Sequence, residues 1–260
     1  MVSGCGSLAA APATPTAAFT ATIEASPTVP VPTATFTAEP SATVVPTATV
    51  DPDGGMFTPE QKQRLYQASL KYLAPTDDDA VRVAQALGFV QGGDPSNMCG
   101  PLAIKILSDA GFVAADVDLK NFWLLDPREK TQRAFLDGIF PPASYQDYHF
   151  DQPINQFDFD KFPLRTGDFL YLYAGGDGFE HMLTVTRVDE AGRVYSVTNY
   201  VTDQVYFAHF AIQEVMLYDP AQPGVGKFFD WTDEKNYALG LTGLGGFEVW
   251  RRNVPLTNTP

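Results

Sequence analysis

The sequence predicts an α+β domain that follows a long tail without regular structure. Helix start and stop signals punctuate residues 58–136, and from residue 168 onward β-branched and aromatic residues recur with a period of two. Helices followed by a run of strands are typical of an α+β fold. We therefore expect N-terminal helices packed on an antiparallel sheet of about six strands.

The tail differs in composition from the rest of the chain. Residues 6–55 are almost entirely Ala, Thr, Pro, Val and Ser, with no Lys or Arg and only four acidic residues. Such a segment cannot bury enough apolar surface to offset the entropy lost on ordering, so we expect it to be disordered. The predicted organisation is a signal remnant at residues 1–5, a linker at residues 6–57 and one domain at residues 58–260, which is long enough to hold a single core.

Charge and hydropathy argue against two kinds of partner. The net charge is −14, and without the four acids of the tail the domain keeps 27 acidic against 17 basic residues, a net charge of −10. Nucleic acids and anionic lipids require clustered Lys and Arg, which the sequence lacks. No run of about 18 apolar residues predicts a membrane span. We expect a monomer that binds no nucleic acid.

The start of the chain favours anchoring by a lipid. The tetrapeptide Val2-Ser3-Gly4-Cys5 resembles a bacterial lipobox, in which the cysteine becomes the lipidated N-terminus. A Thr/Pro-rich tether directly after Cys5 is what a surface-anchored protein would have. We therefore expect an extracellular domain at the bacterial cell surface, in contact with the membrane only through a lipid at Cys5. The alternative is a chance match in a segment rich in small residues.

Two helices are predicted at the start of the domain. Thr58 and Gln61 form a capping box for the first helix. The second helix begins at Thr76, has acids at residues 77–79 that complement its dipole, and ends at Gly88. Capping explains these acids and no spaced ligand set follows them. We therefore expect no metal site and no other cofactor.

A third helix is predicted from Leu102 to Ala110, closed by Gly111, and a short fourth helix from Asp126 to about Leu136. Residues 138–163 lack a clean period and are interpreted as a long loop. The strands are then expected at residues 169–173, 182–188, 194–200, 205–210, 215–218 and 247–250.

Cys99 lies where a loop rich in Gly, Asp, Pro, Ser and Asn turns into the third helix. The helix dipole and the unpaired backbone N–H groups at such a junction favour the reactive thiolate, and the same N–H groups can receive an oxyanion. With Cys5 assigned to lipid, Cys99 has no disulfide partner, which indicates a reactive thiol in an exported domain. The alternative is a small buried apolar residue, the ordinary role of a free cysteine.

A base and its orienting group are expected across one hairpin. His181 opens a strand, and a turn after Asp189 leads into the strand that carries Asn199. If Asp189 pairs with Arg193, paired positions sum to 382, and His181 and Asn199 become diagonal neighbours on one face. A register shift of one residue would break this parity.

Cys99, His181 and Asn199 thus form a candidate triad of nucleophile, base and orienter. Asp203 is a second candidate for the orienter. The other two histidines, His149 and His209, are interpreted as structural.

In this order the three residues resemble the papain-like cysteine peptidase superfamily. The segment from Cys99 to Ala103 looks like the nucleophile segment of the peptidases that remove double-glycine leaders from bacteriocins. Thr166–Leu170, ahead of Glu180–Met182, looks like the cell-wall endopeptidases of the NlpC type and the CHAP amidases. The resemblance covers about residues 91–201 and implies a papain-like fold.

Two features depart from the superfamily pattern. Its oxyanion Gln usually lies nearer to the nucleophile, whereas Gln91 lies eight residues before Cys99. Asn97 or a backbone N–H group is the alternative oxyanion donor. Met98 also stands where NlpC-type enzymes have Asp.

The resemblance implies an exported, surface-anchored cysteine hydrolase that cleaves amide bonds of peptides, with peptidoglycan cross-bridges as the expected substrate. Cys99 would form a thioester, His181 would move the proton from thiol to leaving amine, and water would release the product. Two alternatives stay open. One is a catalytically inactive binding module on a stalk with the same fold. The other is a cysteine acyltransferase, in which a second amine resolves the thioester.

Overall fold

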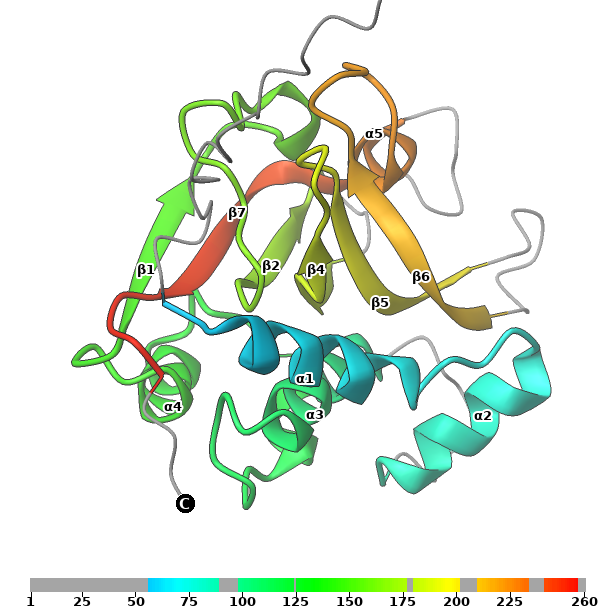
Figure 1. Ribbon diagram of the computed structural model, residues 1–260, viewed down its shortest axis with the longest axis vertical. Helices are drawn as coiled ribbons and strands as arrows, with labels where there is room; N and C mark the ends of the chain where they lie inside the picture. The colour runs from blue at the N-terminus through cyan, green and yellow to red at the C-terminus, as the bar shows by residue number, and fades with distance from the viewer. Residues whose placement is uncertain are drawn as a thin grey trace, which may run out of the picture. The chain divides into compact units, whose positions relative to one another are not determined.

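The computed structural model describes residues 56–88, 98–123, 125–176, 180–201, 210–233 and 241–256. The helical elements are α1 (Pro59–Leu70), α2 (Asp77–Ala86), α3 (Cys99–Asp109), the 3₁₀ turn η2 (Leu119–Phe122), α4 (Lys130–Ile139), the 3₁₀ turn η3 (Ile154–Gln156) and α5 (Lys227–Thr232). The strands are β1 (Tyr145–Phe150), β2 (Phe169–Ala174), β3 (His181–Thr184), β4 (Arg187–Val188), β5 (Val194–Val201), β6 (Phe210–Tyr218) and β7 (Thr242–Arg252) (Figure 1).

The predicted caps of the first two helices are confirmed. The Thr58 N–H donates to Gln61 Oε1 at 2.8 Å, and the Gln61 N–H donates to Thr58 Oγ1 at 3.2 Å, which completes the capping box. Thr76 caps α2 by accepting from the Asp79 N–H, and Gly88 takes the positive φ of 92° that ends this segment. Each helix therefore begins where its local sequence satisfies the free N–H groups of the first turn.

The fourth helix begins later than predicted. Asp126 to Glu129 form a turn in which the Asp126 carboxylate accepts from the Arg128 N–H at 2.9 Å, and α4 starts at Lys130. The sequence predicts the helix start at Asp126, but the side chain of this residue stabilises the preceding turn. The helix also continues three residues past Leu136, to Ile139.

The interpretation of residues 138–163 as one long loop is wrong, because this segment contains α4's last turn, β1 and η3. β1 pairs antiparallel with β7, from Tyr145 opposite Arg252 to Phe150 opposite Phe247. It is an edge strand, and its partner lies about a hundred residues away in sequence. Its mixed polar and aromatic residues form a strand because of this pairing, which the local pattern does not reveal.

The strands form two antiparallel sheets rather than one. Within the described residues the orders are β1-β7-β2-β3 and β4-β5-β6. The segment predicted as one strand at residues 182–188 divides between the sheets, into β3 and β4. Residues 205–209 of another predicted strand lie outside the described residues, and Phe210 begins β6, which continues through the strand predicted at residues 215–218.

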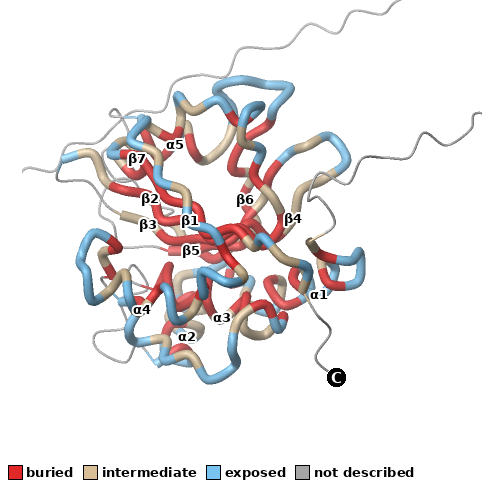
Figure 2. The backbone as a smooth tube through the Cα atoms, turned by 90° about the vertical axis from the view of Figure 1, so that its left-hand side faces the viewer, coloured by how far each residue is buried: buried red, intermediate tan, exposed pale blue. Residues whose placement is uncertain are grey.

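The fold is α+β, as the sequence predicts. Figure 1 shows α1, α2, α3 and α4 on one side of the strands and α5 on the other. The helix-side core includes Cys99, Leu102, Ile106, Tyr171 and Met182. The sheet core includes Leu172, Leu183, Val194, Trp231 and Phe247. Figure 2 shows that buried residues follow the strands and the inward sides of the helices, whereas the outer turns are exposed.

Candidate active site

Cys99 is the first residue of α3, as the sequence predicts, and its side chain belongs to the helix-side core. Only 7% of its surface is exposed. Burial raises the pKa of its thiol, and backbone hydrogen bonds from Met182, Gly100 and Cys99 itself oppose this by favouring the thiolate. The sulfur is therefore surrounded by backbone donors, but the protonated thiol is the resting form.

The close approach of three elements at this point requires glycine at position 100. A Cβ atom at Gly100 would lie 2.7 Å from Met182 Cε and 2.8 Å from the Phe122 carbonyl oxygen. The first turn of α3 is thus pressed against β3 and η2. This contact places the Cys99 sulfur beside the backbone of Met182, the residue that follows His181.

His181 is the first residue of β3 and is partly buried. Its Nε2 atom lies 2.9 Å from Thr198 Oγ1, and its ring packs edge-on against Trp231 at a centroid distance of 5.0 Å. Burial lowers the pKa of His181 to about 4. The imidazole is therefore neutral at pH 7. In the tautomer whose Nε2–H donates to the Thr198 hydroxyl, Nδ1 is left as the proton acceptor.

The sulfur and the imidazole approach β3 from different sides. Met182 packs in the helix-side core with Cys99, whereas its neighbour Leu183 packs in the sheet core. Side chains alternate along a strand, so His181 points with Leu183 toward Trp231. The Cys99 sulfur lies beside the backbone of Met182, the residue that follows His181. Among the described residues, however, no hydrogen bond joins Cys99 to His181.

Asn199 does not hold the imidazole in this structure. The predicted pairing is confirmed in the hairpin itself, where Arg187 lies opposite Tyr195 and Val188 opposite Val194. Thr186 then also donates its N–H to the Tyr195 carbonyl, at 2.9 Å. Thr186 and Arg187 thus both lie opposite Tyr195, which is a β-bulge, and a β-bulge shifts the register by one residue.

Because of the bulge, the face of β5 that meets His181 on β3 is the one opposite to the face that the sequence predicts. Thr198 becomes the diagonal neighbour of His181, and Asn199, which is buried and paired with Ile212, points to the opposite face. The hydroxyl of Thr198 therefore occupies the place that the sequence assigned to the Asn199 amide. The other predicted site residues, Cys5, Gln91, Asn97 and Asp203, lie outside the described residues, as does His209.

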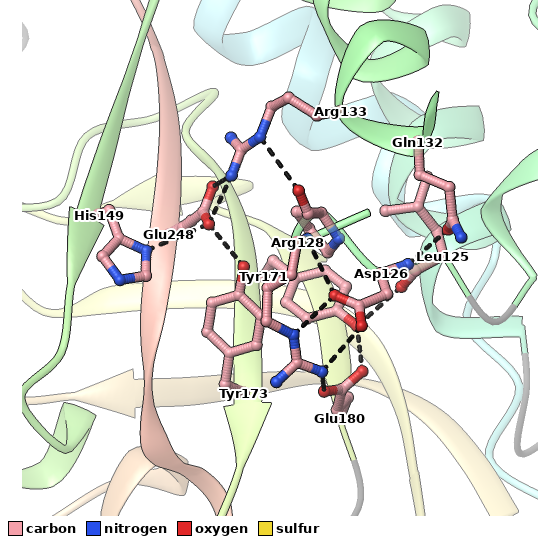
Figure 3. Close-up of polar contacts among 11 residues, drawn as sticks. Leu125, Asp126, Arg128, Gln132, Arg133, His149, Tyr171, Tyr173, Glu180 and Glu248 are labelled. Atoms are coloured by element: carbon pink, nitrogen blue, oxygen red, sulfur yellow. Dashed lines mark hydrogen bonds and ion pairs between the residues drawn. The ribbon is translucent and has the colours of Figure 1, made fainter. Parts of the chain in front are cut away.

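A polar network that the sequence did not reveal lies on the helix side of β2 (Figure 3). Tyr171 Oη lies 2.7 Å from the Leu125 carbonyl oxygen and hydrogen-bonds the Glu180 carboxylate. Arg128 Nη2 donates to Glu180 Oε1 at 2.9 Å and holds Asp126 through two further bonds. Tyr171 packs in the same helix-side core as Cys99, and the negative charge of Glu180 contributes to the raised pKa of the thiol.

The second half of the network surrounds Glu248, whose side chain is 2% exposed. Its carboxylate accepts from Tyr173 Oη at 2.5 Å and from Arg133 Nη2 at 2.7 Å, and lies 3.2 Å from His149 Nδ1. His149 thus belongs to a polar network at the sheet edge. Tyr171 and Tyr173 are two residues apart on one strand, and this spacing was the available signal that both point to the same face.

Comparisons with protein-family models, with curated proteins and with solved structures found no match for this chain. The part of the chain that the structure describes contains no group of three or more His, Cys, Asp or Glu residues placed to hold a metal ion. Nor is any helix in those residues long and apolar enough to span a bilayer. The geometry around Cys99 is therefore the basis for a functional proposal.

Proposed function

We propose that the domain is a cysteine hydrolase of papain-like arrangement that cleaves amide bonds of peptides. One observation carries this proposal: the Cys99 sulfur lies at the start of a helix among backbone N–H donors, one of which belongs to the residue after His181. A nucleophile, oxyanion donors and a base that can reach the nucleophile are the parts that acyl transfer through a thioester requires.

In the proposed reaction the resting pair is neutral. The raised pKa of Cys99 keeps the thiol protonated, and the lowered pKa of His181 keeps the imidazole unprotonated. His181 Nδ1 takes the thiol proton as the sulfur attacks the amide carbon, and the imidazolium then protonates the leaving amine. Water attacks the thioester carbon and passes a proton to the imidazole, the carbon–sulfur bond breaks, and the imidazolium returns the proton to the sulfur, which releases the carboxylic acid and restores the thiol.

This reaction requires the imidazole to close on the sulfur when substrate binds. Catalytic hydrogen bonds are often long in the substrate-free state and shorten only in the complex with substrate. The N–H groups of Cys99 and Gly100, at the start of the α3 dipole, are the proposed oxyanion donors. We further propose export, a lipid anchor at Cys5 and peptidoglycan cross-bridges as substrates, which rest on the sequence resemblance and not on the site.

A second candidate function is a catalytically inactive binding module on a stalk. The contact of His181 with Thr198 and Trp231 favours it, because the candidate base already has a polar partner on the side of β3 away from the thiol. In this case the domain retains the fold and binds peptides without cleaving them.

Incubation of the full chain with cross-linked muropeptides and short peptides separates the two candidates. The hydrolase gives cleavage products and an acyl adduct on Cys99 detectable by mass spectrometry, and both disappear in Cys99→Ala. His181→Ala should abolish turnover, whereas the control His149→Ala should retain it. Binding of these peptides without cleavage by the unmodified chain would overturn the hydrolase and support the binding module.

A further inference from the structure

The Glu180 cluster, defined here as Asp126, Arg128, Tyr171 and Glu180, carries two carboxylates and a single guanidinium. Arg128 donates to both carboxylates, with nitrogen–oxygen distances of 2.8 to 2.9 Å, and its guanidinium lies over the Tyr173 ring, 4.9 Å from the centroid. Tyr171 is 1% exposed, and its hydroxyl hydrogen-bonds the Glu180 carboxylate. The position of the Glu180 carboxylate is thus set by two partners.

The same carboxylate lies on the thiol side of the strand. Glu180 is two residues before Met182, and alternate residues of an extended chain share one face. Met182 packs against the first turn of α3 and its backbone hydrogen-bonds the Cys99 sulfur. Glu180 therefore approaches the nucleophile from the face that His181 does not occupy.

The charges around the thiol come from few elements. Tyr171 lies on β2 in the core that holds Cys99, and Glu180, the residue before β3, is joined to Arg128 and through it to Asp126 in the turn before α4. The first turn of α3 contains no acidic residue, and η2 contributes only Lys120, which is exposed.

We propose that Glu180 is a positioning residue of the Cys99 site that opposes ionisation of the nucleophile, and that Arg128 limits this effect by pairing with Glu180. A negative charge near a thiol disfavours the thiolate, and a guanidinium shared with that charge reduces its field. The catalytic consequence of this arrangement rests on the proposed function; the effect on the thiol does not.

The experiment is a titration of the Cys99 thiol followed by the NMR chemical shift of its Cβ in protein labelled at cysteine. The full chain carries Cys5→Ser, so that Cys99 is the only thiol. In Glu180→Gln, which keeps the shape of the side chain and removes its charge, we expect the midpoint to fall by up to about one pH unit. In Arg128→Gln we expect it to rise by up to about one unit.

Asp147→Asn is the matched control. Asp147 also pairs with an arginine, Arg133, at 3.4 Å, but on β1, and its removal should leave the midpoint unchanged. Because the side chain of Arg128 is 59% exposed, its variant should fold even where Glu180→Gln does not. Equal midpoints in all variants, or shifts of the same sign for Glu180→Gln and Arg128→Gln, would overturn the proposal.

The results that would overturn the proposed hydrolase differ from those that would overturn the role of Glu180 and Arg128. If peptides are not cleaved and the opposite shifts are still observed, Glu180 and Arg128 control the thiol of a site that is not a hydrolase. If peptides are cleaved and the midpoints do not move, the hydrolase stands without this control.

Discussion

His181 Nε2 and Thr198 Oγ1 lie 2.9 Å apart, and this contact sets the orientation of the candidate base. The bulge at Thr186, between β3 and β4, shifts the register relative to β5 by one residue. Thr198 rather than Asn199 therefore lies on the face that meets His181. A hydroxyl can accept from Nε2–H as an amide oxygen would, and in that tautomer Nδ1 is a free acceptor.

Replacing Thr198 by Val should release the imidazole. The change keeps the shape of the side chain but leaves His181 Nε2 without its hydrogen-bond partner, at a cost of about 1–3 kcal/mol in the free energy of unfolding. The imidazole nitrogen NMR shifts of His181 should move with it. Asn199→Ala should leave those shifts unchanged, since Asn199 lies on the other face of β5. An equal response of the two variants would contradict the observed register.

The stability of the domain should fall on acidification because of His181. Its pKa is about 4 in the folded protein, below the value of about 6.5 expected in the unfolded chain. Between these values the unfolded state binds more protons, so this contribution is present above about pH 6.5 and is lost as the pH falls toward 4. Denaturant unfolding at a series of pH values should show this dependence, and it should be weaker in His181→Leu.

His149 serves as the comparison for that measurement. Burial lowers its pKa, but hydrogen bonds to Asp151 and Glu248 raise it more, so that its pKa in the folded state lies above the ordinary value. Its contribution is therefore present at low pH and is lost as the pH rises through the folded pKa. His149→Gln should change the pH dependence in the opposite sense to His181→Leu, and a change in the same sense would contradict these environments.

Gly100→Ala should destabilise the site without altering its chemistry. The added methyl group would meet Met182 and the Phe122 carbonyl at less than contact distance, and we expect a loss of about 1–3 kcal/mol in thermal or denaturant unfolding. Gly138→Ala is the control, since a Cβ there meets nothing within 4 Å and α4 gains about 0.5–1 kcal/mol from the substitution. Similar losses in both variants would show that α3 does not press on β3.

Arg251→Met should be strongly destabilising. Arg251 holds the buried Asp168 through bonds of 2.9 and 2.6 Å, and its removal leaves an unpaired carboxylate at a cost of about 3–5 kcal/mol. The partly exposed pair of Arg187 with Glu214 is the control, and Arg187→Met should cost about 1 kcal/mol or less. Chemical denaturation measures both, and the double variant with Asp168→Leu should recover part of the larger loss.

The segment Thr166–Leu170 shows what a local sequence motif can predict and what it cannot. Its resemblance to cell-wall peptidases suggested a functional element, and the sequence also predicted the strand that begins at Phe169. In the structure Asp168 pairs with Arg251 on β7, a residue of the last strand. The partner is more than eighty residues away, so no local pattern in the sequence could identify it.

By itself the sequence determined the starts of α1 and α2, the α+β class, the turn after Asp189 and the position of Cys99 at a helix start. These follow from interactions within a few residues, such as the Thr58 capping box, or from the period of apolar residues. Only the tertiary structure decided that β1 pairs with β7, that Thr198 rather than Asn199 meets His181, and that Glu180 bonds Tyr171 on the thiol side of β3. Each of these depends on strand register or on packing between distant segments, where a shift of one residue changes the face that a side chain occupies.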